Sequence, residues 1–430
     1  MHLMLKSIVR PALLLTLFYP VTPIFAEDVA TILVASALID PLKGETVANP
    51  VVKISGDRIV SVTNGGTVPK GAKVIDLGDA TILPGVADMH THLTSYDTDF
   101  GIETLALSTG DSAIRGVVNA RRALLAGFTA GRNLGAEGFS DVALRDAIDE
   151  GHIPGPRLQV SGPSIGATGG HCDTNWLAVG FDATSEGVAD GPWAVRQKVR
   201  ENRKYGVDVI KICATGGVLS KGTDPGARQM TSEEMEAIVD EAHMLGMQVA
   251  AHAHGTEGIL YAIRAGVDSI EHSSLIDDEG LELAKRNGTF LSINAYTPVF
   301  MRDQGESLGI PPDSLKRARS MADRRLDRYR AAIEAGARIV FGSDTSTYPH
   351  GDHAKQFSVY VELGMTPMEA IQSATTVAAE SLGWVGDTGA VAAGYFADII
   401  AVDGDPLEDI SVLENVTFVM KGGEVYKSPQ

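Results

Sequence analysis

Cysteine is scarce in this sequence: only Cys172 and Cys213 occur among its 430 residues. One disulfide is therefore the most that the chain can form, and an oxidising compartment would permit it. Cys213, however, lies two residues after Lys211 in an apolar, strand-like run, so these two side chains should point the same way. We expect Cys213 to face the interior of the fold as a free thiol that packs like a small hydrophobe, with a disulfide as the alternative.

Positive charge is also in short supply. The chain has 36 Lys and Arg residues against 55 Asp and Glu residues, and its formal net charge is −19. Nucleic acid and anionic membrane surfaces repel such a chain. The sequence also has no internal repeat, no low-complexity tract and no second long apolar segment after the first 26 residues. We therefore expect no nucleic-acid partner, and no membrane association once that first segment has been removed.

The first 26 residues have the pattern of a secretory signal peptide. Two basic residues precede an apolar run, residues 11–25, which ends at Ala26. This pattern predicts cleavage near Ala26 and Glu27, and a periplasmic or secreted protein. The run is shorter than the ~20 residues of a membrane span and is interrupted by two prolines, so an uncleaved anchor is the less favoured alternative. No cysteine stands at the cleavage point, which argues against a lipid anchor.

The most informative motif is His90-Thr91-His92, which follows the strand-like residues 80–85. Side chains two residues apart on a strand point the same way, so the two imidazoles should converge on one spot. A His-x-His pair can bind a metal ion, although many such pairs are incidental surface features. Residues further along the chain decide between these two interpretations.

Four further polar residues lie in or at the end of short apolar runs that predict strands. They are Lys211 in 209–213, His252 in 249–254, His272 in 269–272 and Asp344 in 339–344. Helical patterns alternate with these runs, at 191–205, 231–245, 256–265 and 318–335. Alternating strands and helices predict a parallel sheet closed into a (β/α)8 barrel, whose polar groups meet at the carboxyl ends of the strands.

Both ends of the chain predict a second module, because short alternating or apolar runs lie between turn residues in 31–62 and again in 398–420. The fold class that follows is α/β, a TIM-like barrel with a small β-sandwich built from both termini. We predict these domains: signal peptide 1–26, first part of the sandwich 27–86, barrel 87–386 and second part of the sandwich 387–430.

These residues together resemble the metal-dependent amidohydrolase superfamily over nearly all of the chain that remains after cleavage. The resemblance implies a site for two divalent metal ions, with zinc as the expected metal, whose ligands would be His90, His92, Lys211, His252, His272 and Asp344. More specifically, Ile210–Val218 and Gly169-Gly170-His171 look like the branch of prolidase-like carboxypeptidases and ochratoxin-hydrolysing amidohydrolases. Members of this superfamily often form homo-oligomers, so we expect one here.

Lysine needs a change of state to bind a metal ion, because its ammonium group has no lone pair. Burial beside metal lowers the pKa of a lysine, and the resemblance implies that Lys211 then takes up carbon dioxide as a carbamate that bridges both ions. An unmodified Lys211 beside a single ion is the alternative. Two ions can lower the pKa of water toward neutrality and polarise a carbonyl. Asp344 would then carry a proton from water to the leaving nitrogen, unless it only caps a helix.

Substrate contacts are implied by the resemblance as well. His171, His254 and the backbone N–H groups of 216–218, with Gly217 and Val218, would hold a free α-carboxylate on the leaving amino acid. The alternatives are a solvent-exposed loop histidine at His171 and a packed histidine at His254. Some proline-selective relatives carry tyrosine at the latter position, which argues against proline selectivity here. The segment 292–301 should bring Tyr296, Phe300 and Met301 toward an apolar pocket, unless these side chains pack on a neighbouring helix.

The expected function is therefore hydrolysis of an amide bond that releases a C-terminal amino acid from a peptide, an N-acyl amino acid or an aryl amide such as ochratoxin A. The substrate would carry a free C-terminal carboxylate. The first rival is a cyclic-amide, lactone or deaminase activity on the same fold, although Lys211 argues against the deaminase pattern. The second rival is a barrel scaffold without catalysis, which the complete ligand set and Asp344 disfavour.

Overall fold

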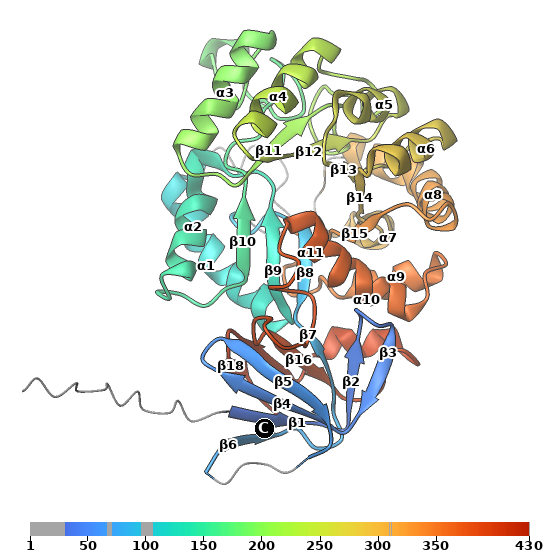
Figure 1. Cartoon of the computed structure of the whole chain (residues 1–430). Coiled ribbons are helices and arrows are strands. Elements are labelled where there is room, and N and C mark those ends of the chain that lie inside the picture. Colours follow the sequence, from blue (N-terminus) through green and yellow to red (C-terminus); the bar gives the residue numbers. More distant parts are fainter. Residues whose placement is uncertain (1–30, 67–70, 96–105, 309, 311, 430) are drawn as a thin grey trace, which may run out of the picture.

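The computed structural model describes residues 31–66, 71–95, 106–308, 310 and 312–429. The predicted signal peptide, residues 1–26, lies outside these residues. The described chain forms a large unit of strands and helices and a smaller unit of strands, which pack end to end (Figure 1). Within the described ranges, no helix is both long and apolar enough to cross a membrane.

Eight parallel strands form the centre of the large unit. They are β8 (Val86–Thr91), β9 (Phe128–Asn133), β10 (Arg157–Val160), β11 (Val209–Cys213), β12 (Gln248–Ala253), β13 (Ser269–His272), β14 (Phe290–Ile293) and β15 (Ile339–Phe341). Three of them pair in the order β10-β9-β8 and five in the order β11-β12-β13-β14-β15. Nearly every residue of these strands is buried, as expected of parallel strands that are covered on both faces.

Backbone hydrogen bonds join the two sheets at both seams. Between β8 and the residues after β15, Asp344 N donates to His90 O at 2.7 Å and His92 N donates to Thr345 O at 3.2 Å. Between the residues after β10 and β11, Ile165 N donates to Lys211 O at 2.8 Å. The eight strands therefore close into a (β/α)8 barrel, as the sequence predicted.

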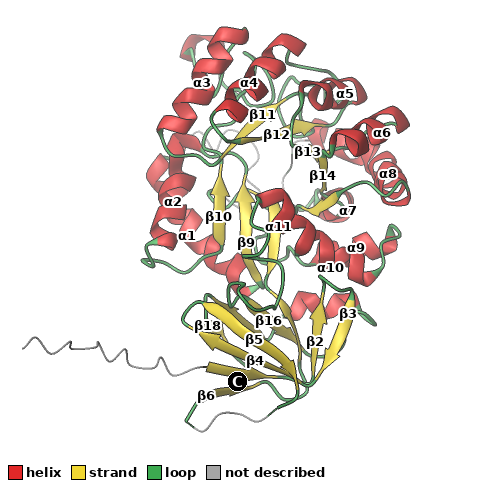
Figure 2. Ribbon diagram, in the orientation of Figure 1, coloured by secondary structure: helices red, strands yellow, loops and turns green. Residues whose placement is uncertain are grey.

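Helices follow the strands and cover the outside of the barrel (Figure 2). They are α1 (Thr109–Leu125), α2 (Ser140–Asp149), α3 (Pro192–Lys204), α4 (Ser232–Met244), α5 (Thr256–Ala265), α6 (Asp278–Asn287), α7 (Tyr296–Gln304), α8 (Pro312–Glu334), α9 (Lys355–Glu362), α10 (Pro367–Ser373) and α11 (Thr376–Leu382). Capping boxes begin α1, α4 and α10, where a Ser or Thr side chain and an acid three residues later satisfy each other's backbone N–H groups.

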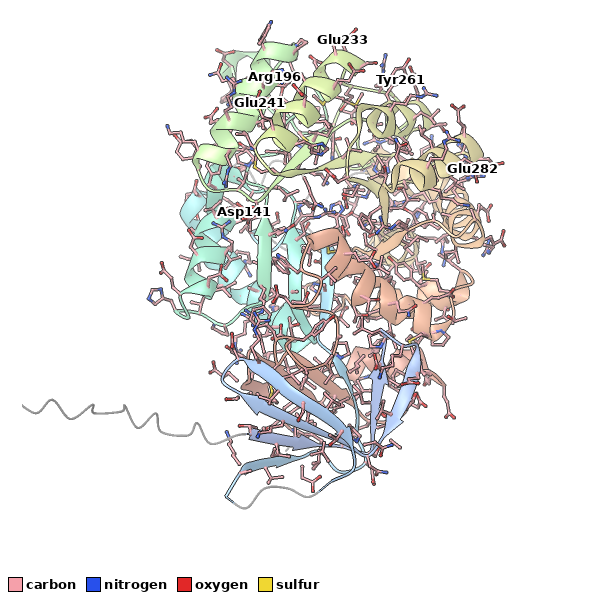
Figure 3. All side chains as sticks on the ribbon, in the orientation of Figure 1. Asp141, Arg196, Glu233, Glu241, Tyr261 and Glu282 are labelled. Carbon is pink, nitrogen blue, oxygen red and sulfur yellow. A yellow bond between two sulfur atoms is a disulfide. The ribbon has the colours of Figure 1, made fainter. Side chains whose placement is uncertain are left out.

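Ion pairs link neighbouring helices on the outer surface. Arg196 of α3 reaches Glu241 of α4 at 3.3 Å, and Arg200 reaches the same carboxylate at 2.7 Å. Figure 3 shows Arg196 and Glu241 between these two helices. Ion pairs at the surface contribute little to stability, so the buried apolar faces of the helices hold them against the barrel.

Two sheets form the smaller unit. Their strands are β1 (Thr31–Val34), β2 (Ala37–Asp40), β3 (Glu45–Ala48), β4 (Pro50–Ser55), β5 (Arg58–Asn64), β6 (Lys73–Asp76), β7 (Thr81–Pro84), β16 (Ile399–Val402), β17 (Phe418–Lys421) and β18 (Glu424–Lys427). They pair in the orders β5-β4-β1-β6 and β18-β17-β16-β7-β2-β3. A separate apolar core that includes Leu33, Val52 and Phe418 lies between the sheets.

Strand β7 differs from the simplest interpretation of the sequence, in which residues 80–85 form the barrel strand that leads into the His-x-His motif. Residues 81–84 belong to the smaller unit, where β7 pairs antiparallel with β16 from the other end of the chain. Gly85 separates it from β8, which carries His90. A side chain at Gly85 would collide with Thr129 of β9, so only glycine allows the chain to pass from one unit into the other at this point.

Candidate active site

The residues that the sequence singled out lie around one cavity at the carboxyl ends of the barrel strands. The cavity holds about 330 Å³, which is within the range of small-molecule sites. All six predicted metal ligands line it: His90, His92, Lys211, His252, His272 and Asp344. His171, His254 and Val218 line the same cavity.

His90, His92 and Asp344 form the first donor group, at the seam between β8 and β15. Their ligand atoms lie within 4.8 Å of one another. The two Nε2 atoms are 3.3 Å apart, and Asp344 Oδ1 lies 3.5 Å from His90 Nε2 and 3.3 Å from His92 Nε2. Two imidazole nitrogens and a carboxylate oxygen that converge on one point suit a divalent cation such as zinc.

Glu271 orients His90 from behind. Its Oε2 lies 2.9 Å from His90 Nδ1, and its Oε1 accepts a hydrogen bond from Arg132 Nη2 at 2.7 Å. Burial alone would raise the pKa of Glu271, but Arg132 and His90 lower it below its usual range, so the carboxylate is ionised. Burial lowers the pKa of His90 to about 4. A neutral His90 that keeps its proton on Nδ1, beside Glu271, presents the lone pair of Nε2 to the cavity, which is the form that binds metal.

His252, His254 and His272 form the second donor group, and their ligand atoms also lie within 4.8 Å of one another. Burial lowers the pKa of each well below 6.5, and these histidines are therefore neutral. The His254 ring stacks on His272, with ring centroids 4.6 Å apart, and its Nδ1 lies 2.7 Å from Ser274 Oγ. His254 thus lies as close to the other two imidazoles as a metal ligand would.

Lys211 lies in the middle of β11 and is only 3% exposed. Burial lowers its pKa to about 8, although the nearby carboxylates Glu271 and Asp344 oppose the shift. The amine is therefore far easier to deprotonate than an exposed lysine, and a neutral amine is the reactive form that carbon dioxide requires. The environment of Lys211 fits the carbamate that the resemblance implies.

Two donors adopt an unusual backbone conformation. His272 has φ 73° and Asp344 has φ 61°, in the left-handed region that most side chains avoid. Both residues lie at or just after the ends of barrel strands, and the seam hydrogen bond from Asp344 N to His90 O holds one of them in place. Conformations of this kind persist where surrounding structure fixes them, and they cluster at functional sites.

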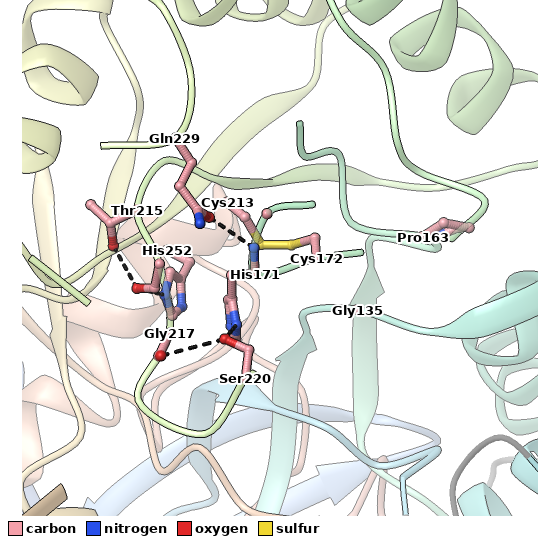
Figure 4. The surroundings of a disulfide bond; sticks show 12 residues. Gly135, Pro163, His171, Cys172, Cys213, Thr215, Gly217, Ser220, Gln229 and His252 are labelled. Carbon is pink, nitrogen blue, oxygen red and sulfur yellow. Dashed lines mark hydrogen bonds between the residues drawn. A yellow bond between two sulfur atoms is a disulfide. The ribbon is translucent and has the colours of Figure 1, made fainter. Parts of the chain in front are cut away.

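The expectation of a free thiol at Cys213 is wrong. Cys213 forms a disulfide with Cys172 in the loop between β10 and α3 (Figure 4). The alternation of side chains along the strand did place Cys213 on the side of β11 that faces the cavity. The loop after β10, however, folds back and brings Cys172 against Cys213. The bond therefore ties His171, the residue before Cys172, to the strand that carries Lys211.

His171 is not the solvent-exposed loop residue that was the alternative. Its ring packs on His252 with centroids 4.1 Å apart, and its Nδ1 lies 2.9 Å from Ser220 Oγ. Burial lowers its pKa to about 4, so it is a neutral hydrogen-bonding group. A side chain at Gly217 would collide with the His171 ring, which explains glycine at that position (Figure 4).

The predicted backbone donors of 216–218 are only partly free. Gly216 N donates to Ala227 O at 3.1 Å and Gly217 N donates to Thr223 Oγ1 at 3.2 Å, both within the same loop. Gly217 therefore shapes the loop, and its N–H is already engaged. Val218 lines the cavity and remains the candidate of this segment for direct substrate contact.

The segment after β14, which forms α7, contributes differently from the expectation. Met301 lines the cavity, together with Thr297 and Pro298. Tyr296 and Phe300 instead pack against Tyr348, with ring centroids 4.9 Å and 5.7 Å from it. These two aromatic residues therefore pack internally, but against the loop after β15 and not against a neighbouring helix as the alternative had it.

Sequence analysis missed three charged residues of the site, Arg132, Glu271 and Arg325. The signal was present for the first two, because each is a charge inside a strand-like run, and buried charges require partners. Arg325 lies within a helix rich in charged residues, where nothing distinguishes it from its exposed neighbours. It lines the cavity and is only 5% exposed.

Fold and site together define a class of hydrolase, and comparison with known proteins identifies it. The sequence model of the amidohydrolase family matches residues 81–426. This chain belongs to the amidohydrolase family, and it is a hydrolytic enzyme. The relatives below place it among the members that cleave amide bonds.

Ochratoxinase of Aspergillus niger is 36% identical over 431 aligned residues, which cover 94% of this chain and 88% of that protein. The crystal structure of a Xaa-Pro dipeptidase with methionine bound in its active site matches with a TM-score of 0.87 and 37% identity, over 93% of this chain and 100% of the other. A prolidase complexed with N-methylphosphonate-L-proline matches with a TM-score of 0.85 and 32% identity, over 93% and 100%.

Proposed function

We propose that this protein uses two divalent metal ions to release a C-terminal amino acid from peptides, N-acyl amino acids or aryl amides such as ochratoxin A. The observation that carries the proposal is the pair of donor groups, one at the β8–β15 seam and one at the ends of β12 and β13, which share a single cavity with a buried lysine. The similarity to an ochratoxinase and to a Xaa-Pro dipeptidase supports this substrate class.

The metal ions, most simply zinc, would lower the pKa of a water molecule and polarise the scissile carbonyl. Asp344 performs the proton transfers. Burial raises the pKa of its carboxyl group, but His92, His90 and Lys211 outweigh burial and lower the pKa below its usual value. The carboxylate is therefore ionised at neutral pH and can accept a proton at Oδ1 or Oδ2 from water, then donate it to the leaving nitrogen.

Lys211 joins the two donor groups as a carbamate, and its lowered pKa supports this role. Lys211→Ala should lose bound metal and activity together, and added short-chain carboxylates should restore part of both. Metal analysis and intact mass under non-denaturing conditions test the proposal. An unmodified lysine amine in fully active enzyme would contradict it.

The leaving group's carboxylate would contact His171, His254 and the N–H of Val218. His254 could instead complete the second metal site, because it belongs to that donor group. Metal content separates the two roles, since His254→Asn should keep both ions if it binds substrate, whereas His252→Asn should lose one.

A substrate panel tests the function directly. Zinc-loaded enzyme should release phenylalanine from ochratoxin A and amino acids from N-acyl amino acids and dipeptides, measured by chromatography. Substrates whose C-terminal carboxylate is esterified or amidated should be poor. Equal hydrolysis of free and blocked termini would indicate a general amidase, and turnover of cyclic amides or lactones alone would favour the rival activity.

We also propose that the protein is exported and homo-oligomeric. The disulfide between Cys172 and Cys213 supports export, because such bonds persist in oxidising compartments. Cell fractionation and size-exclusion chromatography with light scattering test the two statements. Recovery of a reduced, cytoplasmic monomer would contradict both.

A further inference from the structure

Arg325 is a buried cation with no acidic partner in the described structure. Two arginines are almost completely buried there, Arg132 and Arg325. Arg132 is neutralised by Glu271 at 2.7 Å. The hydrogen bonds of Arg325 run to a neutral group, from Nε and Nη2 to Tyr329 Oη at 3.3 and 3.1 Å.

Such a group needs an anion. A guanidinium remains charged at any ordinary pH, and burying an uncompensated charge is costly. Asp344 is the acidic residue that lines the cavity among the described residues, and it is already engaged by His90 and His92. Among the described residues, none supplies the compensating charge for Arg325, and an anion that enters the cavity would supply it.

The surroundings of Arg325 indicate what enters. Arg325 and Ala318 are seven residues apart on α8, so they lie on the same helix face, and both line the cavity. Ala318 packs in an apolar cluster with Val218 and Met301, which also line the cavity. An anion bound by Arg325 would thus belong to a molecule that has an apolar group beside it.

We propose that Arg325 binds the free α-carboxylate of the leaving amino acid, and that Val218, Met301 and Ala318 receive an apolar side chain of the same residue. The preferred substrates are then amides of apolar α-amino acids. The proposal rests on the proposed function and adds a guanidinium to the predicted carboxylate contacts His171 and His254, which line the same cavity. A planar guanidinium can make two parallel hydrogen bonds to a carboxylate, which an ammonium group cannot.

The test compares two substrates in four proteins. N-acetyl-L-phenylalanine has a free carboxylate, and N-acetyl-L-phenylalaninamide does not. The proteins are wild type, Arg325→Met, Arg325→Lys and Arg330→Met, the last being an exposed arginine on the same helix that pairs with Asp327. Bound metal and thermal unfolding are measured for each protein.

Arg325→Met should lower kcat/KM for the free acid by about 10- to 100-fold, the loss expected for one charge-assisted hydrogen-bonding partner. Its kcat/KM for the blocked amide should change little, so Arg325→Met should lose the preference for the free acid that wild type shows. Arg325→Lys should recover part of the loss, and Arg330→Met should behave as wild type. Binding of L-phenylalanine, measured by calorimetry without turnover, should weaken by a similar factor in Arg325→Met.

The outcomes separate the two proposals. If wild type shows no preference for the free acid, the proposed function fails. If wild type has the preference and metal-replete Arg325→Met keeps it, or loses both substrates equally, the role of Arg325 fails and the function stands. If Arg325→Met does not fold, the same two measurements are made on Arg325→Lys: its preference for the free acid and its binding of L-phenylalanine by calorimetry. Equal turnover of N-acetyl derivatives of phenylalanine, lysine and glutamate would overturn the proposed preference for apolar side chains.

Discussion

At the scale of single residues, the two roles proposed for Asp344 can be separated by experiment. Its carboxylate lies within 3.5 Å of His90 and His92 and could hold metal, move protons or do both. Asp344→Asn keeps the size and one oxygen ligand but removes the basic site. Turnover should fall by at least about 10²-fold while most of the metal remains bound. Metal analysis beside steady-state kinetics checks this, and near-normal turnover in a metal-replete variant would remove Asp344 from the mechanism.

Glu271 provides a second test, because it contacts both the buried Arg132 and the proposed metal ligand His90. Glu271→Gln leaves Arg132 buried without a counter-charge, which should lower the free energy of unfolding by about 3–5 kcal/mol. It also removes the anion that orients His90, so metal affinity should fall about 10- to 100-fold. Chemical denaturation of the metal-free protein and metal titration measure the two effects.

A double variant separates these effects. Arg132→Met with Glu271→Gln removes the stranded charge, so it should regain much of the stability while metal affinity stays low. If metal affinity recovers together with stability, Glu271 has only a structural role.

Which residues line the cavity could be predicted from sequence, but how they are supported could not. His90, His92, His252, His272 and Asp344 each follow or end a strand-like run, and parallel strands bring such ends together. The partners behind them depend on which interior side chains meet across the barrel. Arg132 and Glu271 lie 139 residues apart, and no local pattern connects them.

At the scale of elements, the disulfide fixes a loop that has little regular structure. It joins Cys172 to β11 across a separation of 41 residues and holds the adjacent His171 over the cavity. Replacing both cysteines by serine should lower the free energy of unfolding by about 2–4 kcal/mol and weaken substrate binding through His171. Denaturation curves and KM values test this.

Reductant supplies the control for the disulfide. It should shift wild type toward the behaviour of the double serine variant and leave that variant unchanged. Two free thiols in fully active, air-oxidised protein would contradict the prediction.

Elements were predicted well where the pattern is local. The helical pattern at 256–265 coincides with α5, and those at 191–205 and 231–245 match α3 and α4 closely. The partner of a strand was harder to predict. Residues 80–85 look like the strand that leads into the His-x-His motif, yet β7 pairs with β16, more than 300 residues away in the chain. The path of the loop that carries Cys172 likewise depends on tertiary contacts. The alternation of side chains along the strand therefore led to the wrong prediction of a free thiol at Cys213.

At the scale of the whole molecule, polar contacts join the barrel to the smaller unit. Lys421 of β17 donates to Gly155 O of the barrel at 2.6 Å, and Arg157 of β10 lies 3.3 Å from Asp398. The Arg157 guanidinium also stacks on the Phe396 ring, 3.6 Å from its centroid. These contacts fix the base of the barrel, at the end opposite the cavity.

Lys421 makes this interface dependent on pH. Burial lowers its pKa to about 8 from the ordinary 10.5, with Arg157 adding to the shift. At pH values between about 8 and 10.5, the unfolded chain binds more protons at Lys421 than the folded protein does. The contribution of Lys421 to the free energy of unfolding therefore rises with pH in this range. The free energy of unfolding of wild type minus that of Lys421→Met should therefore increase from pH 7 to pH 10.

Urea denaturation at both pH values measures this difference, with the exposed Lys73→Met as control. A difference that is constant with pH would show that Lys421 titrates normally.

The seam between β8 and the residues after β15 has a consequence for when the enzyme becomes active. The first donor group draws His90 and His92 from the first barrel strand and Asp344 from beyond the last. Asp88 reinforces the same seam, since its Oδ1 accepts hydrogen bonds from His90 N and Ser343 N. A chain that is incomplete, or that has not yet joined its first strand to its last, has no such group. With the proposed metal site at this seam, hydrolysis would begin only when the ring of strands has closed, and activity would report on completed folding.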